Sequence, residues 1–228
     1  MRVWRSTLNA FLSAVIASPC AVCGRVLDCP LEGAVCDPCW AAVVTHRAPF
    51  ALQTIARGQS IGAYEGVLRD ILHALKYHGR RSVAPRLSHL MARHGRDVLT
   101  DAEVVVPVPL HPWRERGRGF NQSDDLARGL GLPVVRALRR TRVTRPQVEL
   151  PKEERRANVR DAFAIQTGWY LRALVGATDP PVEQKVVVLV DDVATTGATL
   201  DACARVLKAA GAAEVRALTA ARVVTAPR

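Results

Sequence analysis

The chain has no run of about 18 apolar residues, few aromatic residues, and neither internal repeats nor low-complexity tracts. A membrane-spanning helix needs such an apolar run, so no segment is expected to cross a bilayer. Aromatic residues make up only 5% of the 228 residues, so the base-stacking platforms of single-strand binders are scarce. The length and the hydrophobic content of 49% suit one domain of ordinary size with a small appendage.

Acidic residues are also in short supply. The chain has 21 Asp and Glu against 32 Lys and Arg, which gives a net charge of +11 and a pI near 10.1. This balance favours an anionic partner, such as a phosphorylated metabolite, a nucleic acid or a membrane surface, and it does not specify a fold. A GC-rich genome would produce the same arginine excess, so the charge alone does not choose among these partners.

The N-terminal residues, in which Arg2 and Arg5 precede the largely apolar stretch 8–20, imitate a signal peptide. Their large apolar side chains nevertheless fall on one stripe of a helix, whereas a secretory core is usually apolar all round. We therefore expect an amphipathic helix that packs on the protein. The protein is then expected to be cytoplasmic, and its cysteines to be reduced thiols or metal ligands.

Two C-x-x-C motifs stand near the front of the chain, formed by Cys20 with Cys23 and by Cys36 with Cys39. Two such turns facing each other supply four sulfur ligands for a tetrahedral Zn²⁺ ion. Redox cysteines and disulfides are the alternatives, and the doubled spacing in a cytosolic chain favours zinc. Four protein ligands leave no open position on the metal, so the site is expected to be structural.

The rest of the chain alternates between strand and helix patterns. Helices are expected near residues 67–78, 82–94, 122–130 and 196–210, and strands near residues 61–66, 103–109, 133–136, 185–190 and 214–224. The connecting segments 46–56, 111–122 and 166–184 are expected to be irregular. The alternation predicts an α/β fold with a mostly parallel sheet flanked by helices. We expect two units, an N-terminal helix and zinc-ribbon or knuckle module over residues 1–45 and the sheet domain over residues 46–228.

The stretch VVLVDDVATTGATL raises the question of what compensates two adjacent carboxylates, Asp191 and Asp192, at the end of an apolar strand. Solvent exposure, a metal ion and a polyhydroxylated ligand are the candidates. The turn that follows enters a helix, whose free N–H groups and three hydroxyls form a phosphate cradle. A sugar phosphate satisfies both features. The two aspartates would accept hydrogen bonds from ribose hydroxyls, and the 5′-phosphate would lie against Ala194, Thr195, Thr196, Gly197, Ala198 and Thr199.

This stretch resembles the phosphoribosyl-diphosphate (PRPP) signature of type I phosphoribosyltransferases. The order of a four-cysteine knuckle, Y-E-G, L-K-Y-H-G, V-P-V-P, R-G-F-N-Q, a basic R-x-x-N segment and this signature is similar to the ComF/GntX family over almost the whole chain. The resemblance implies a type I phosphoribosyltransferase-like fold that binds PRPP with Mg²⁺. Ala194 departs from the family pattern, in which a bulkier residue is common, and this would loosen the ribose pocket.

The resemblance also implies roles for further residues. The backbone of Val108, Pro109 and Leu110 would face the diphosphate, together with Arg114 and Arg118. A flexible lid over residues 141–160 would bring Arg155, Arg156 and Asn158 to the same group. A solvated loop is the alternative for the arginines of 114–118, and Lys76 is either another anion contact or a solvated residue.

The function implied is transfer of the phosphoribosyl group to an unidentified acceptor with release of pyrophosphate. No general base declares itself, so no catalytic residue is assigned. The alternative is a non-catalytic protein that senses PRPP or a nucleotide and binds single-stranded DNA during DNA uptake (competence). Residues 111–160 carry 13 basic and 6 acidic residues, +7 of the net +11, which serves either function. Trp113 and Phe120 could stack on bases there, and no protein partner is indicated.

Overall fold

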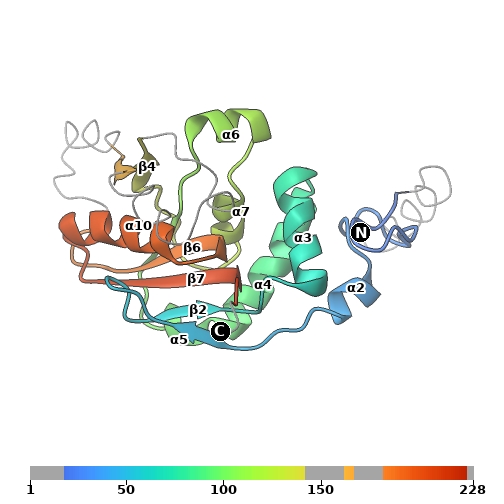
Figure 1. Ribbon diagram of the computed structural model, residues 1–228, viewed down its shortest axis with the longest axis horizontal. Helices are drawn as coiled ribbons and strands as arrows, with labels where there is room; N and C mark the ends of the chain where they lie inside the picture. The colour runs from blue at the N-terminus through green and yellow to red at the C-terminus, as the bar shows by residue number, and fades with distance from the viewer. Residues whose placement is uncertain (1–17, 142–161, 167–181, 225–228) are drawn as a thin grey trace.

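The computed structural model describes residues 18–141, 162–166 and 182–224 (Figure 1). The expected N-terminal helix and the lid residues Arg155, Arg156 and Asn158 lie outside these ranges. The strands are β1 (Ala48–Phe50), β2 (Gly58–Ser60), β3 (Val104–Pro107), β4 (Leu138–Arg140), β5 (Phe163–Ile165), β6 (Val186–Ala194) and β7 (Glu214–Arg222). The helices are α2 (Asp37–Ala41), α3 (Gly66–Tyr77), α4 (Ala84–His94), α5 (Arg96–Leu99), α6 (Pro112–Arg118), α7 (Gln122–Arg128) and α10 (Ala198–Ala209), with a 3₁₀ turn at Arg81–Val83.

The sheet has the strand order β1-β2-β7-β6-β3, in which β2, β7, β6 and β3 run parallel and β1 is an antiparallel edge strand. Strands β4 and β5 form a separate antiparallel pair. The expectation of a mostly parallel sheet is confirmed. Among the described helices, none is long and apolar enough to cross a membrane.

Helices cover both faces of the sheet, and the apolar run of β6 explains why. Val188 and Val190 are buried in a cluster that includes residues of α3, α4 and α7, whereas Val187 and Leu189 are buried against residues of α10. Side chains of a strand alternate between its faces, so a strand buried on both sides must be apolar at every position. The same alternation places Asp191 on the α10 side and Asp192 on the α3 side.

The cysteine segment packs against α3 and α4. Leu27 and Trp40 belong to the same buried cluster as Ile71 and Leu72 of α3, and the Arg86 guanidinium of α4 lies 5.1 Å from the centre of the Trp40 ring. Figure 1 shows this segment on the side of α3 that faces away from the sheet. Helix α3 is therefore held between the cysteine segment and the sheet.

Helix α3 stands beyond the carboxyl ends of β6 and β7 and does not run back along the sheet (Figure 1). The chain enters it through Tyr64, whose N–H donates to the carbonyl of Arg222 at the end of β7 (2.8 Å). The return along the sheet is made by α4, where Gly95 packs closely on Leu218 of β7. The last turn of α3 consequently reaches the edge of the sheet where parallel α/β folds bind ligands.

Strand β6 is longer than expected, and the strand end at residue 190 was wrong. Pairing with β3 does stop there, at Pro107 opposite Val190. Pairing with β7 continues through Asp191 opposite Thr219 to Ala194 opposite Arg222. The two aspartates therefore lie on a strand that has already lost its neighbour on one side, which opens space beside them while their backbone stays fixed.

Two connecting segments and one expected strand also differ from expectation. Residues 112–118 form α6, because His111 Nδ1 accepts from Trp113 N–H (3.2 Å) at its start and Gly119 closes it with a φ of 79°. Residues 133–136 form only an isolated bridge between Val134 and Val105, and the strand begins later, at Leu138. Strand β1 lies within the expected linker.

Candidate functional site

Asp192 is compensated by a lysine from another helix. Its side chain is 6% exposed, and its Oδ2 lies 3.0 Å from Nζ of Lys76 in the last turn of α3, whose side chain is 16% exposed. Oδ1 accepts from the N–H of Val193 (2.6 Å). Of the two interpretations of Lys76, the solvated one is excluded by this buried ion pair.

Asp191 is held by the first turn of α7. Its Oδ1 accepts from Ser123 Oγ (2.9 Å) and from the N–H of Asp192 (2.9 Å). Ser123 is placed by Asn121, whose Oδ1 accepts from Ser123 N–H (3.0 Å) and whose Nδ2 donates to the carbonyl of Val108 (3.0 Å). The start of α7 and the backbone of β6 thus anchor Asp191 through its Oδ1.

The pair is short of positive charge. Burial and then the charge of Asp192 raise the pKa of Asp191 to about 7, although Lys76, the Asp192 N–H and Ser123 act in the opposite direction. The pKa of Lys76 is raised: burial lowers it, and the charges of Asp192 and Asp191 outweigh that effect. One ammonium for two carboxylates leaves an edge that a ligand with several hydroxyl donors can complete.

The expected phosphate cradle follows directly after β6. Gly197 adopts a φ of +77°, and a Cβ there would lie 2.6 Å from Cδ2 of Leu52, so this position requires glycine. Thr196 Oγ1 accepts from the N–H of Ala198 (3.4 Å), at which α10 begins. The cradle is thus a tight turn at the N-terminus of a helix of 12 residues, where backbone N–H groups favour an anion.

Of the three backbone positions expected to face the diphosphate, only one has an N–H group available for a ligand. The N–H of Val108 donates to the carbonyl of Val190 (2.9 Å) and extends the sheet, and Pro109 has no N–H to offer. Leu110 therefore carries the one amide of the three that a ligand can use. Its neighbours in the chain lead straight into α6.

Arg114 and Arg118 lie on α6, above the end of β3. Arg118 donates to Gln122 Oε1 (2.7 Å), and its guanidinium lies 5.5 Å from the centre of the Tyr77 ring, so α6 contacts the end of α3. A cavity of about 520 Å³ opens under α6, lined among others by Pro109, Leu110, Asn121, Asp124, Arg136 and Arg140. Neither Arg114 nor Arg118 lines it, so their role at the diphosphate stays a prediction.

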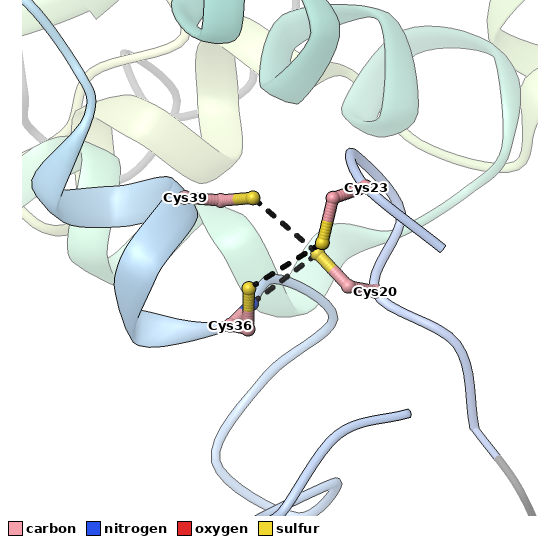
Figure 2. A group of neighbouring side chains, drawn as sticks. All are labelled: Cys20, Cys23, Cys36 and Cys39. Atoms are coloured by element: carbon pink, nitrogen blue, oxygen red, sulfur yellow. Dashed lines mark hydrogen bonds between the residues drawn. The ribbon is translucent and has the colours of Figure 1, made fainter. Parts of the chain in front are cut away.

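Cys20, Cys23, Cys36 and Cys39 form a compact cluster in which all four Sγ atoms lie within 4.8 Å of one another. Figure 2 shows their side chains converging, two from α2 and its N-terminus and two from the loop opposite. Sγ–Sγ distances are 3.9 Å between Cys20 and Cys39 and 3.7 Å between Cys23 and Cys36. Tetrahedral Zn–S bonds of about 2.3 Å place the sulfurs about 3.8 Å apart, so this donor set fits zinc.

Two residues of the site were missed or left undecided by sequence reasoning. Ser123 gave no signal, because a serine in the first turn of a helix is common as a cap. Lys76 was left open, because its burial depends on the direction of α3. Both act on the aspartates from outside the signature stretch.

Comparison with known proteins identifies a family and several relatives to which this chain is similar. Residues 117–225 match the family described as "Phosphoribosyl transferase domain". "DNA utilization protein YhgH" of Escherichia coli (strain K12) is 31% identical over 204 residues, covering 85% of this chain and 74% of the relative. "Competence protein F" of Haemophilus influenzae is 30% identical and covers 71% of each chain. "Competence protein ComFC" of Bacillus subtilis is 28% identical, covering 92% of this chain and 80% of the relative.

Proposed function

The chain belongs to the ComF family of phosphoribosyltransferase-like proteins, and we propose that it binds PRPP with Mg²⁺ and transfers the phosphoribosyl group to an acceptor. The observation that carries the proposal is the adjacency of Asp191 and Asp192 to the turn at the start of α10, at the carboxyl edge of the parallel sheet. This spacing suits the hydroxyls and the 5′-phosphate of one ribose.

Each part of the ligand has a group of matching chemistry. Asp191 Oδ2 and the Asp192 carboxylate accept hydrogen bonds from the ribose hydroxyls, and these bonds are charge-assisted. The N–H groups and hydroxyls of residues 195–199 receive the 5′-phosphate. The amide of Leu110 faces the diphosphate, and Arg114, Arg118 and the sequence-derived lid residues remain candidates for its charge.

In the proposed reaction, a lone pair of the acceptor forms a bond to the anomeric carbon while the bond from that carbon to the diphosphate oxygen breaks. Pyrophosphate leaves with the bonding electrons, and the transition state resembles an oxocarbenium ion. The carboxylate pair orients the ribose for this in-line displacement, and the donors near Leu110 stabilise the departing charge. Mg²⁺, when bound with PRPP, offsets charge on the diphosphate.

Pyrophosphate release from PRPP with Mg²⁺, measured across a panel of bases and amines, tests turnover. We expect release to depend on one acceptor class and to be abolished in Asp191→Asn. Slow release that is independent of the acceptor and equal in the variant contradicts transfer. It leaves binding to be judged by titration.

We propose further that the cysteine cluster holds one structural Zn²⁺ ion and that the protein resides in the cytoplasm, where its six cysteines, none of which forms a disulfide, stay reduced. Metal analysis should give one zinc per chain. Cys36→Ser should lose the metal and unfold the front of the chain, since structural zinc contributes on the order of 10 kcal/mol in small modules. Cys29→Ser is the matched control, because Cys29 lies outside the cluster. Full zinc occupancy in Cys36→Ser overturns this proposal.

Binding of single-stranded DNA is a second candidate, favoured by exposed aromatic side chains beside basic ones. Trp113 on α6 and Tyr77 at the end of α3 are both exposed, and Arg118 lies between these helices, over the Tyr77 ring. The names of two relatives refer to DNA utilization and to competence. Filter binding at several salt concentrations tests this. Trp113→Ala with Tyr77→Ala should weaken binding by about 1–3 kcal/mol per stacked base, and equal affinity in the variant contradicts it.

A further inference from the structure

Lys76 lies outside the part of the chain that the phosphoribosyl transferase domain family matches, residues 117–225. It reaches the carboxylate pair only because α3 stands across the carboxyl ends of the strands (Figure 1). The family comparison therefore gives this lysine no role, and its role has to be argued from its contacts.

The position of Lys76 is costly for a lysine. A flexible ammonium side chain at a helix end loses both rotamer freedom and hydration when it is buried. This cost is offset by the ion pair with Asp192, whose Oδ2 lies 3.0 Å from Nζ of Lys76. Its other polar neighbour is the Tyr64 ring, 5.8 Å from Nζ. An ammonium has three N–H donors, and the position of Lys76 at the end of α3 brings these donors to the Asp192 carboxylate.

We infer that Lys76 is a positioning residue of the PRPP site, whose ammonium fixes the Asp192 carboxylate for the ribose hydroxyls and holds a positive charge beside the two aspartates. This inference rests on the proposed function and deepens it. The competing account is that the ion pair only ties α3 to the sheet. The two accounts differ in what happens to ligand binding as the pH changes.

The charged groups around the pair set the expected pH dependence. Asp191 is faced by Asp192 on its own strand, by Lys76 from α3, by Arg140 from β4 and by the Cys203 thiol from α10. Burial and the charge of Asp192 raise the pKa of Asp191, and the charge of Lys76 lowers it. Without the ammonium Asp191 protonates at higher pH, and a protonated carboxyl group is a poorer acceptor for a hydroxyl.

The test is calorimetric titration with PRPP and Mg²⁺ between about pH 6 and 9. The variants are Lys76→Met, Lys76→Arg and the control Arg69→Met on the exposed side of α3. At pH 7 we expect Lys76→Met to bind at least about tenfold more weakly, with partial recovery toward pH 9. The affinity of Lys76→Arg, which keeps the charge, should stay within about threefold of that of wild type. The affinity of the control Arg69→Met should equal that of wild type.

Thermal melting of each variant accompanies the titrations, and Lys76→Gln replaces Lys76→Met if the latter does not fold. If Lys76→Met or Lys76→Gln binds PRPP at pH 7 with wild-type affinity, the inference is wrong but the proposed function still stands. A loss of the same size at every pH has the same consequence, because it indicates a purely structural ion pair. Absence of PRPP binding by folded wild type overturns the proposed function, and the inference with it.

Discussion

The two ends of the same parallel sheet hold ion clusters of opposite balance. At the amino end, Glu214 of β7 accepts from both Arg57 and Arg216, with N–O distances between 2.8 and 3.0 Å. At the carboxyl end, Asp191 and Asp192 are adjacent, and Lys76 forms an ion pair with Asp192. The amino end thus pairs one carboxylate with two guanidinium groups, whereas the carboxyl end brings two carboxylates together.

The pKa values follow this balance. Hydrogen bonds from Arg216 lower the pKa of Glu214 to about 2. Burial acts in the opposite direction, and hydrogen bonds from Arg57 lower the pKa further. Burial and the neighbouring charge raise the pKa of Asp191 to about 7. The amino end is satisfied by protein groups, whereas the carboxyl end is left with free acceptor capacity. Strongly raised pKa values of this kind are common at functional sites. The comparison therefore supports the proposal that the carboxyl end is the ligand site, whereas the cluster at the amino end stabilises the fold.

Replacing both carboxylates at the carboxyl end should have the largest effect on binding. Asp191→Asn with Asp192→Asn removes two charged acceptors, each worth about 1.5–3 kcal/mol, so the affinity for PRPP should fall on the order of a hundredfold or more. Calorimetry measures it. Glu214→Gln, at the amino end, should bind PRPP normally. Unchanged affinity in the double variant contradicts the assignment of the carboxyl end.

Arg216→Met should have the largest effect on stability. The Arg216 side chain is 3% exposed and also donates to the carbonyls of Val98 (3.2 Å) and Thr100. Removing one partner of a buried pair costs about 3–5 kcal/mol of the free energy of unfolding. Urea denaturation measures it, with Arg57→Met as the control. Arg57 is 51% exposed, so its loss should cost about 1 kcal/mol or less. Equal losses in the two variants would mean that the buried Arg216 stabilises the fold no more than the exposed Arg57.

The pH dependence of stability should differ in sign between the two ends. The raised pKa of Asp191 means that its contribution is fully present below its ordinary value of 3.8 and is lost as the pH rises through about 7. The lowered pKa of Glu214 means that its contribution is present above 4.5 and is lost as the pH falls toward about 2.

Unfolding free energies of wild type, Asp191→Asn and Glu214→Gln across this pH range test the signs. Asp191→Asn should gain on wild type as the pH rises from about 4 to 8. The difference between wild type and Glu214→Gln should shrink as the pH falls below about 4. If the unfolding free energies of the three proteins changed with pH in parallel, the predicted difference in sign between the two ends would be wrong.

Thr196→Val should have the smallest effect. It removes one hydroxyl from the phosphate cradle and leaves the backbone N–H groups in place, so the loss in PRPP affinity should be about 1 kcal/mol. The melting temperature should stay close to that of wild type, because Thr196 is only partly buried. A loss as large as that of the aspartate variants would mean that the hydroxyl, and not the backbone, dominates the cradle.

Much of this comparison could be predicted from the sequence. The doubled C-x-x-C spacing predicted the four-cysteine cluster, and the alternation of strand and helix patterns predicted a mostly parallel sheet flanked by helices. The placement of α3 could not be predicted, because helical periodicity indicates which face is buried and not the direction in which a helix packs. The pairing of Lys76 with Asp192 depends on that direction.

The extent of β6 was also beyond local reasoning. Two aspartates are poor strand formers, and only the partner strand β7, which continues to Arg222, keeps them in the ladder. Helix α6 did have a local signal, Pro112 at its start and Gly119 at its end, which the arginine-rich composition obscured. Strand pairing is a contact between distant residues, so it becomes visible only in the folded chain.

Titration of the folded, zinc-loaded wild-type protein with PRPP, with and without Mg²⁺, tests the central claim most directly. Ribose 5-phosphate, which lacks the diphosphate, and pyrophosphate, which lacks the sugar, are the comparison ligands. The account predicts saturable binding of one PRPP per chain that requires Mg²⁺ and is stronger than binding of either part. Absence of saturation with PRPP at millimolar concentration, in protein that melts cooperatively, would contradict it.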